Sequence, residues 1–235
     1  MLLRKIKRNI ENRLGIQIHK MRHGLVEWAD IKASGCHINT IFDVGANIGQ
    51  SALKFREAFP KSLIYCFEPV SSIFRELKAT VSGDSNINCY SLAFSCNPGN
   101  GTIYLAQGAT QNSFIPMPDT IGTESVSVKT VDNFASENCI ERIDLLKIDT
   151  EGHDLEVLKG ASHMLSGGRT AFVLAEVGFN PMDNRHVLFD DVRSLLMEKG
   201  FSLFGIYDQE LEWTGEQRIR FANVCFSNEE AFRKI

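Results

Sequence analysis

Two short segments in the first third of the chain combine apolar runs, carboxylates and glycines. Residues 41–50 read IFDVGANIGQ, and residues 65–69 read YCFEP. Each apolar run has the character of a strand and meets an acidic residue, and the first continues into two closely spaced glycines. At the carboxyl edge of a parallel sheet, glycines let the backbone approach a ligand, and a carboxylate can hold two ribose hydroxyls. The pair therefore predicts a pocket for a nucleoside.

The glycine spacing excludes the dinucleotide fingerprint. That fingerprint, GxGxxG, would need glycines at positions 45, 47 and 50, but Asn47 and Gln50 occupy two of them. The form D-x-G-x-N-x-G resembles the S-adenosylmethionine loop of Rossmann-like methyltransferases. Asp43 is expected to accept hydrogen bonds near the amino-acid part of that cofactor, and Glu68 to hold the ribose. The expected cofactor-binding residues are Asp43, Gly45, Ala46, Asn47, Gly49, Glu68, Pro69 and Ala93.

A second group of candidate residues lies in LLKIDTEGHDLEVLKGA, residues 145–161. Asp149 ends an apolar strand at the same predicted edge, where a charge needs a partner, and Glu151 and His153 follow closely. A histidine can accept the proton of an alcohol near neutral pH. Alternatively, His153 faces solvent in a first helical turn, and Glu151 only favours the helix dipole. These three residues are the candidates for orienting and deprotonating a methyl acceptor.

Glu176, in AEVGFN, ends the next apolar strand and completes the set of catalytic candidates. Asp149 and Glu176 could together bracket a divalent cation. They could equally accept hydrogen bonds from the acceptor without a metal. We favour the second interpretation and predict no metal site, because two carboxylates do not make a full ligand set.

From residue 38 onward, short apolar strands alternate with helical patterns, which is typical of a parallel α/β sheet. Residues 106–124 interrupt this alternation with small and polar residues, so we expect a long loop that closes over the site. The expected strands are 40–44, 63–67, 87–93, 102–105, 125–131, 143–148, 171–177, 201–207 and 221–226. The expected helices are 49–58, 70–81, 131–137, 153–165 and 188–199.

The composition is typical of a soluble α/β domain and indicates that its cysteines are reduced. The 235 residues are 43% hydrophobic and 23% charged, and no apolar run is long enough to cross a membrane. The six cysteines form no CxxC pair, so structural thiols in a cytosolic protein are the simplest account. The amino terminus lacks the apolar core and cleavage site of a secretory signal.

Charge is distributed unevenly along the chain. Residues 1–25 hold seven Lys or Arg and one Glu, a net +6, so the total of −4 leaves −10 on the remainder. A body this acidic disfavours a nucleic-acid partner. We expect residues 1–37 to be a basic amphipathic helical extension, and residues 38–235 to be the catalytic domain. The extension either packs on the domain or contacts, peripherally, the inner face of a membrane or a membrane-bound enzyme.

Together, DVGANIGQ, CFEP, LLKIDTEGHDLEVLKGA and AEVGF resemble the FkbM-type S-adenosylmethionine-dependent methyltransferases, over residues 41–204. The Asn112-Ser113 pair also resembles a serine pair often present in that family. The resemblance implies a Rossmann-like class I fold. Its sheet would have seven mostly parallel strands with a final antiparallel strand, and helices on both faces. It also implies O-methylation, commonly of sugar hydroxyls in glycans or of secondary metabolites.

Three functional hypotheses follow. The first is an S-adenosylmethionine-dependent O-methyltransferase acting on a hydroxyl of a glycan or related small molecule. The second is a magnesium-assisted O-methyltransferase, and the third is a non-catalytic cofactor-binding partner of a membrane-associated glycosyltransferase. The intact acidic and glycine residues favour an enzyme. The sequence leaves the identity of the acceptor and the oligomeric state open.

Overall fold

A computed structural model of the chain describes residue 13 and residues 23–106, 112–116, 118–183, 185–212, 215 and 217–232. Its centre is a seven-stranded sheet in the order β3-β2-β1-β7-β8-β10-β9. Neighbouring strands from β3 to β8 pair in parallel, and β10 runs antiparallel to both β8 and β9. This confirms the predicted class I sheet with one antiparallel final strand. The strands are β1 (Thr40–Val44), β2 (Leu63–Phe67), β3 (Ile87–Tyr90), β7 (Ile143–Ile148), β8 (Thr170–Gly178), β9 (Phe201–Leu211) and β10 (Ile219–Asn228).

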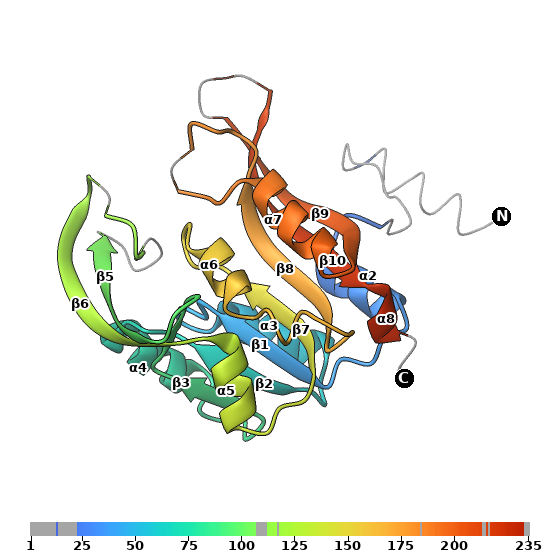
Figure 1. Ribbon diagram of the computed structural model, residues 1–235, viewed down its shortest axis with the longest axis horizontal. Helices are drawn as coiled ribbons and strands as arrows, with labels where there is room; N and C mark the ends of the chain where they lie inside the picture. Colours follow the sequence, from blue (N-terminus) through green and yellow to red (C-terminus); the bar gives the residue numbers. More distant parts are fainter. Residues whose placement is uncertain are drawn as a thin grey trace.

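Helices cover both faces of this sheet (Figure 1). One apolar cluster joins a sheet face to α5 (Val131–Glu137), α6 (Asp154–Lys159) and α7 (Phe189–Glu198). The opposite face packs on α2 (Glu27–Ala33), α3 (Gln50–Ala58) and α4 (Ser71–Thr80). A short helix, α8 (Glu229–Phe232), ends the described part. Every residue of β7 is buried, so its mostly apolar side chains pack against the helices on both faces of the sheet.

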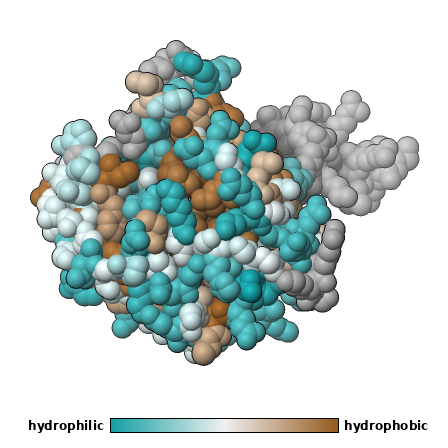
Figure 2. All heavy atoms as spheres, viewed as in Figure 1, coloured by the Kyte–Doolittle hydropathy of each residue, from teal (hydrophilic) through white to brown (hydrophobic). Residues whose placement is uncertain are grey.

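A second sheet of three strands stands beside the carboxyl edge of the first, in the order β4-β6-β5 (Figure 1). It consists of β4 (Ala93–Phe94), β5 (Gly99–Ala106) and β6 (Thr120–Lys129). Its apolar side packs against the start of α4 through a cluster that includes Ile73, Ile103 and Val126. Seen from the same side, apolar side chains gather over the middle of the molecule, with hydrophilic ones around the periphery (Figure 2).

Several predicted elements differ from the structure in their bounds, and three of these differences concern the path of the chain near the site. The strand expected at 87–93 is divided, because Ala93 leaves the main sheet to pair with Val128 of β6. The loop expected to reach residue 124 already becomes strand at Thr120. The first half of β6 has little apolar alternation and is held by backbone pairing with β5. The helix expected to reach residue 165 ends at Lys159, and its C-cap is Gly160, where a Cβ would lie 2.2 Å from the carbonyl oxygen of Ser95.

The predicted amphipathic helix lies outside the described residues, apart from residue 13. Within the predicted extension, the described residues 27–33 form α2, which the sequence patterns did not indicate. Trp28 of α2 meets the ring of Phe55 on α3 edge-on at 4.7 Å, and Ile31 is fully buried. The hydroxyl of Tyr207 on β9 donates to Asp30 over 3.1 Å. Residues 27–33 are therefore part of the layer that covers the sheet.

Candidate active site

The turn after β1 lies directly across the end of β7. Gly45 has φ +77°, and a Cβ at this position would lie 1.8 Å from the carbonyl oxygen of Asp149. The backbone nitrogens of Gly45 and Ala46 each donate to the carbonyl of Phe67 over 3.0 Å. Only glycine combines the left-handed conformation with so close an approach. The turn is thereby fixed against the ends of both neighbouring strands.

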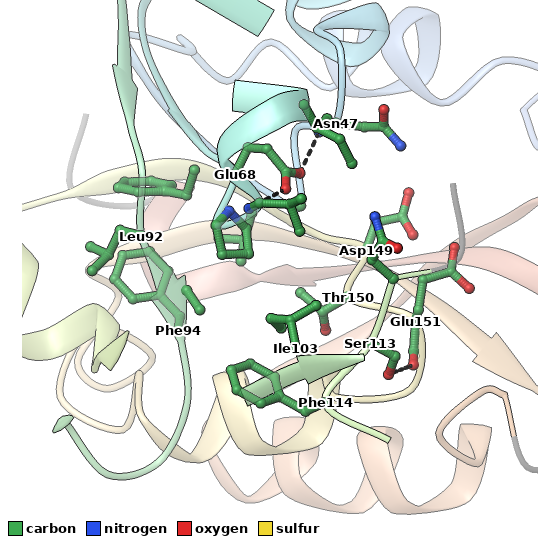
Figure 3. Close-up of a pocket in the computed structure, with 18 of the residues that line it drawn as sticks. Asn47, Glu68, Leu92, Phe94, Ile103, Ser113, Phe114, Asp149, Thr150 and Glu151 are labelled. Carbon is green, nitrogen blue, oxygen red and sulfur yellow. Dashed lines mark hydrogen bonds between the residues drawn. The ribbon is translucent and has the colours of Figure 1, made fainter. Parts of the chain in front are cut away.

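Glu68, the first residue after β2, is joined to this turn by hydrogen bonds. Its Oε2 accepts from the backbone nitrogen of Asn47 over 3.2 Å, and Oε1 accepts from that of Val70 over 2.9 Å. The residue is 6% exposed, and burial raises the pKa of its carboxyl to about 7, against the lowering effect of both bonds. Figure 3 shows the side chain beside Asn47 at the wall of a pocket. The two predicted segments thus meet at one edge of the sheet.

A cavity of about 330 Å³ begins at Glu68 and extends to the end of β8. One end is walled by the glycine turn, Glu68 and a set of apolar side chains: Val70, Ile73, Leu92, Phe94 and Ile103. The other end holds Asp149, Thr150, Glu151 and Glu176. In the close-up, Leu92 and Phe94 lie on the side of Glu68, and Asp149 and Glu151 lie across the cavity from them (Figure 3). An apolar end and an acidic end therefore share one space.

The acidic end is built on a strained turn after β7. Glu151 has φ +51°, a conformation that is uncommon for a residue with a side chain. Ser113 is 4% exposed and its hydroxyl donates to the carbonyl of Glu151 over 2.7 Å. Burial, followed by the charges of Asp149 and Glu176, raises the pKa of the Glu151 carboxyl to about 8. The turn thus presents a carboxyl group that gains and loses its proton near neutral pH.

Comparison with known proteins identifies the family. A family model described as a methyltransferase FkbM domain matches residues 43–203, well over half of the chain. The chain belongs to the FkbM methyltransferase family. This confirms the resemblance inferred from the motifs, and the matched range contains the glycine turn, Glu68 and the acidic turn.

Curated relatives of this FkbM-family protein are methyltransferases by name. It is 30% identical over 142 residues to Methyltransferase 1 of Beauveria bassiana, covering 51% of this chain and 57% of that protein. It is 23% identical over 177 residues to the 2-O-methyltransferase NoeI of Sinorhizobium fredii, covering 68% and 69%. It is 28% identical over 154 residues to the hexuronic acid methyltransferase AglP of Haloferax volcanii, covering 62% and 59%. The match therefore spans less than two thirds of the length of the first and third of these relatives.

Solved structures support the fold alone. The fibrillarin pre-rRNA processing protein of Methanococcus jannaschii superposes with a TM-score of 0.50 at 15% identity, covering 82% of this chain and 67% of that chain. This similarity confirms the class I arrangement of the sheet.

The cofactor of the FkbM family is S-adenosylmethionine, and the residues at the apolar end fit it. Glu68 presents a nearly buried carboxyl beside the glycine turn, where ribose hydroxyls would find an acceptor. The apolar wall beyond it suits a purine ring. Of the predicted cofactor residues, Gly45, Asn47, Glu68, Pro69 and Ala93 line the cavity. Ala46 is 1% exposed and Gly49 begins α3, so both shape the turn from behind.

Asp43 lies beneath the cavity rather than on its wall. Its side chain is fully buried, and its Oδ1 lies 3.3 Å from Nζ of Lys147 on the neighbouring strand β7. Lys147 also donates to Asp149 Oδ2 over 3.1 Å. Burial alone would lower the pKa of this lysine, but Asp149 and Asp43 outweigh it and raise the pKa. The structure therefore gives Asp43 a direct contact with Lys147, which in turn holds Asp149.

His153 does not line the cavity either. Its Nε2 lies 3.0 Å from the hydroxyl of Ser95, and its ring packs on Phe114 with centroids 4.4 Å apart. Burial lowers the pKa of this histidine. Asp149, Glu151 and Glu176 do line the cavity, so the structure brings together three of the four predicted catalytic residues.

Two residues that the sequence patterns did not single out are central to the site. Lys147 stands within the predicted strand 143–148, where it and Asp144 are the charged residues among apolar ones, and this would have been a usable signal. His186 lies 3.1 Å from Glu176, but it stands outside every motif identified in the sequence. Within the described part of the chain, no cluster of three or more His, Cys, Asp or Glu side chains is arranged to hold a metal ion. None of the described helices is long and apolar enough to cross a membrane.

Proposed function

We propose that this protein transfers the methyl group of S-adenosylmethionine to a hydroxyl of a sugar-containing or related small-molecule acceptor. The observation that carries the proposal is the single cavity with two chemically different ends. Glu68 and the apolar wall suit the cofactor at one end, and Asp149, Glu151 and Glu176 suit a hydroxyl acceptor at the other. The names of the relatives NoeI and AglP, a 2-O-methyltransferase and a hexuronic acid methyltransferase, support transfer to a sugar.

The bound cofactor supplies an electrophilic methyl group on a sulfonium, and the protein must position the acceptor and remove its proton. Positioning supplies much of the acceleration in such a reaction. Glu151 is suited to take the proton, because a base is most effective when its pKa lies near the working pH. Asp149 is held by Lys147, so its carboxylate is oriented to accept a hydrogen bond from the same acceptor.

Two measurements test this function. Calorimetry should detect binding of S-adenosylmethionine and of S-adenosylhomocysteine to the purified protein. Mass spectrometry should then detect a methyl ether on at least one member of a panel of glycosides, incubated with and without EDTA. Absence of cofactor binding would refute the proposal, and loss of turnover in EDTA would favour the metal-assisted alternative.

Peripheral membrane contact by the basic extension stays a separate prediction, tested by sedimentation with anionic vesicles at low and high salt.

A further inference from the structure

The carboxylate of Glu176, near the end of β8, is held by a buried histidine from the segment 178–187. Nε2 of His186 lies 3.1 Å from Glu176 Oε2, and Nδ1 lies 2.8 Å from Asp183 Oδ2. A neutral imidazole has one N–H, so it would turn a lone pair toward one of these carboxylates, whereas an imidazolium donates to both. Burial lowers the pKa of His186, but the hydrogen bonds to Glu176 and Asp183 outweigh it and raise the pKa. The two carboxylate partners therefore favour the imidazolium form of His186.

Further contacts fix this histidine to the sheet. Nε of Arg220, on β10, lies 3.1 Å from Asp183 Oδ2, and the His186 ring stacks on Phe221 with centroids 4.4 Å apart and planes at 16°. The side chains of Asp183, His186 and Arg220 are 5%, 7% and 10% exposed. We call Glu176, Asp183, His186 and Arg220 the His186 cluster. Its two carboxylates and two cations balance, as groups removed from water require.

Only Glu176, of these four residues, lines the cavity. Its Oε2 faces His186, while Oε1 has no hydrogen-bond donor among the described residues. Glu151 lies near enough for Glu176 to raise its pKa and for His186 to lower it. The charged groups around His186 are therefore Glu176 on β8, Asp183 in its own segment, Arg220 on β10 and Glu151 after β7.

The segment that carries His186 also touches the acidic turn. A Cβ at Gly152 would lie 2.8 Å from the carbonyl oxygen of Arg185 and 3.1 Å from Cδ1 of Ile115. Arg185 reaches Asp119 over 3.5 Å, just before β6. The described segments 112–116, 149–153 and 185–188 therefore meet around Gly152, next to the acceptor end of the cavity.

We propose that His186 is a positioning residue for the methyl acceptor: by holding Oε2 of Glu176, it presents Oε1 to a hydroxyl of the acceptor. This inference rests on the proposed function, because it gives Glu176 a role toward that acceptor. The acceptor group that binds to Oε1 of Glu176 therefore donates a hydrogen bond and carries no charge. Lys147, the one cation that lines the cavity among the described residues, already contacts Asp43 and Asp149. A carboxylate or phosphate at this end would meet the acidic side chains of Asp149, Glu151 and Glu176.

The test compares His186→Gln with His37→Gln, a matched change at an exposed histidine before β1, at the opposite end of the strand from the cavity. In the wild-type protein, nitrogen NMR of the His186 ring should show both nitrogens protonated at pH 7. A neutral His186 ring would overturn the proposal.

Kinetics then separates positioning from a merely structural effect. With the glycoside that the wild-type protein methylates, His186→Gln should raise the acceptor KM about tenfold, the equivalent of about 1.4 kcal/mol of lost binding. The Kd of S-adenosylmethionine should stay within about twofold, and kcat should change less than KM. A fall in kcat with KM unchanged would contradict the proposal.

If His186→Gln does not fold, Asp183→Asn removes one partner of the imidazolium at nearly constant volume and should change the same quantities in the same direction. Failure to bind cofactor would refute the proposed function, while nitrogen NMR of the His186 ring would still decide the pairing of His186 with Glu176.

Discussion

Nζ of Lys147 lies 3.3 Å from Oδ1 of Asp43, so the buried carboxylate of β1 is neutralised from the adjacent strand β7. The two residues are register partners in the sheet. Asp43 is fully buried, and its oxygens make no hydrogen bond of ordinary length and angle with the described residues. A buried charge without its partner is strongly destabilising. This pair therefore ties the stability of the sheet to the position of Asp149.

Replacing Lys147 with methionine should lower the free energy of unfolding by about 3 to 5 kcal/mol, because Asp43 keeps its burial and loses its counter-ion. Urea denaturation measures the change. The double variant Asp43→Asn, Lys147→Met should recover most of it. Lys129→Met removes an exposed pair with Glu137 and should cost less than about 1 kcal/mol. Equal losses from the two lysine changes would show that burial of the Lys147 pair contributes nothing.

Cofactor affinity should increase as the pH rises through about 7, where the Glu68 carboxyl ionises. The ionised form accepts hydrogen bonds from ribose hydroxyls, so cofactor binding is linked to loss of a proton. Calorimetry between pH 6 and pH 8 should show this increase in the wild-type protein. Glu68→Gln should weaken binding about tenfold or more at pH 8 and abolish the pH dependence. Glu76→Gln, on the exposed side of α4, is the control and should leave both unchanged.

The rate of methyl transfer should rise with pH around an apparent pKa of about 8, because Glu151 must be ionised to take a proton. Glu151→Gln should lower kcat about a hundredfold or more, within the range for removal of a general base. Its cofactor Kd should change little, since Glu151 lies across the cavity from Glu68. A rate profile that keeps its shape in Glu151→Gln would assign the proton transfer to another group.

Asp154 should make the protein less stable at high pH. It is 1% exposed, its Oδ1 has no hydrogen-bond partner among the described residues, and burial raises its pKa to about 7. Since the folded state holds this proton more tightly than the unfolded state, stability falls as the pH rises from about 4 to about 7. Asp154→Asn imitates the protonated form. It should therefore stabilise the protein at pH 8 by a few kcal/mol at most, where one pKa unit corresponds to about 1.4 kcal/mol.

Chemical denaturation of Asp154→Asn at pH 5 and pH 8 measures this difference. The stabilisation should be much smaller at pH 5, where the wild-type carboxyl already carries its proton in the folded state. Asp190→Asn, at an exposed position in the first turn of α7, is the control and should show no comparable dependence. Equal effects of Asp154→Asn at both pH values would refute the assignment.

The sequence by itself determined the family, the order of strands and helices, and the end of the sheet at which the site lies. Residues 40–44, 63–67 and 143–148 were predicted as strands with the bounds that the structure has. These strands are predominantly apolar because both faces of a parallel strand are buried. Asp43, Glu68 and Asp149 were visible because a charge at the end of such a run has a local signal.

Only the tertiary structure decided how those charges are paired. Asp43 lies beneath the cavity on Lys147, His153 turns to Ser95, and Glu176 is held by His186. Likewise, the chain leaves the main sheet after β3 because Ala93 finds a partner in β6. Most of these outcomes depend on contacts between segments far apart in the chain, and hydrophobic periodicity reports only on neighbours along the sequence.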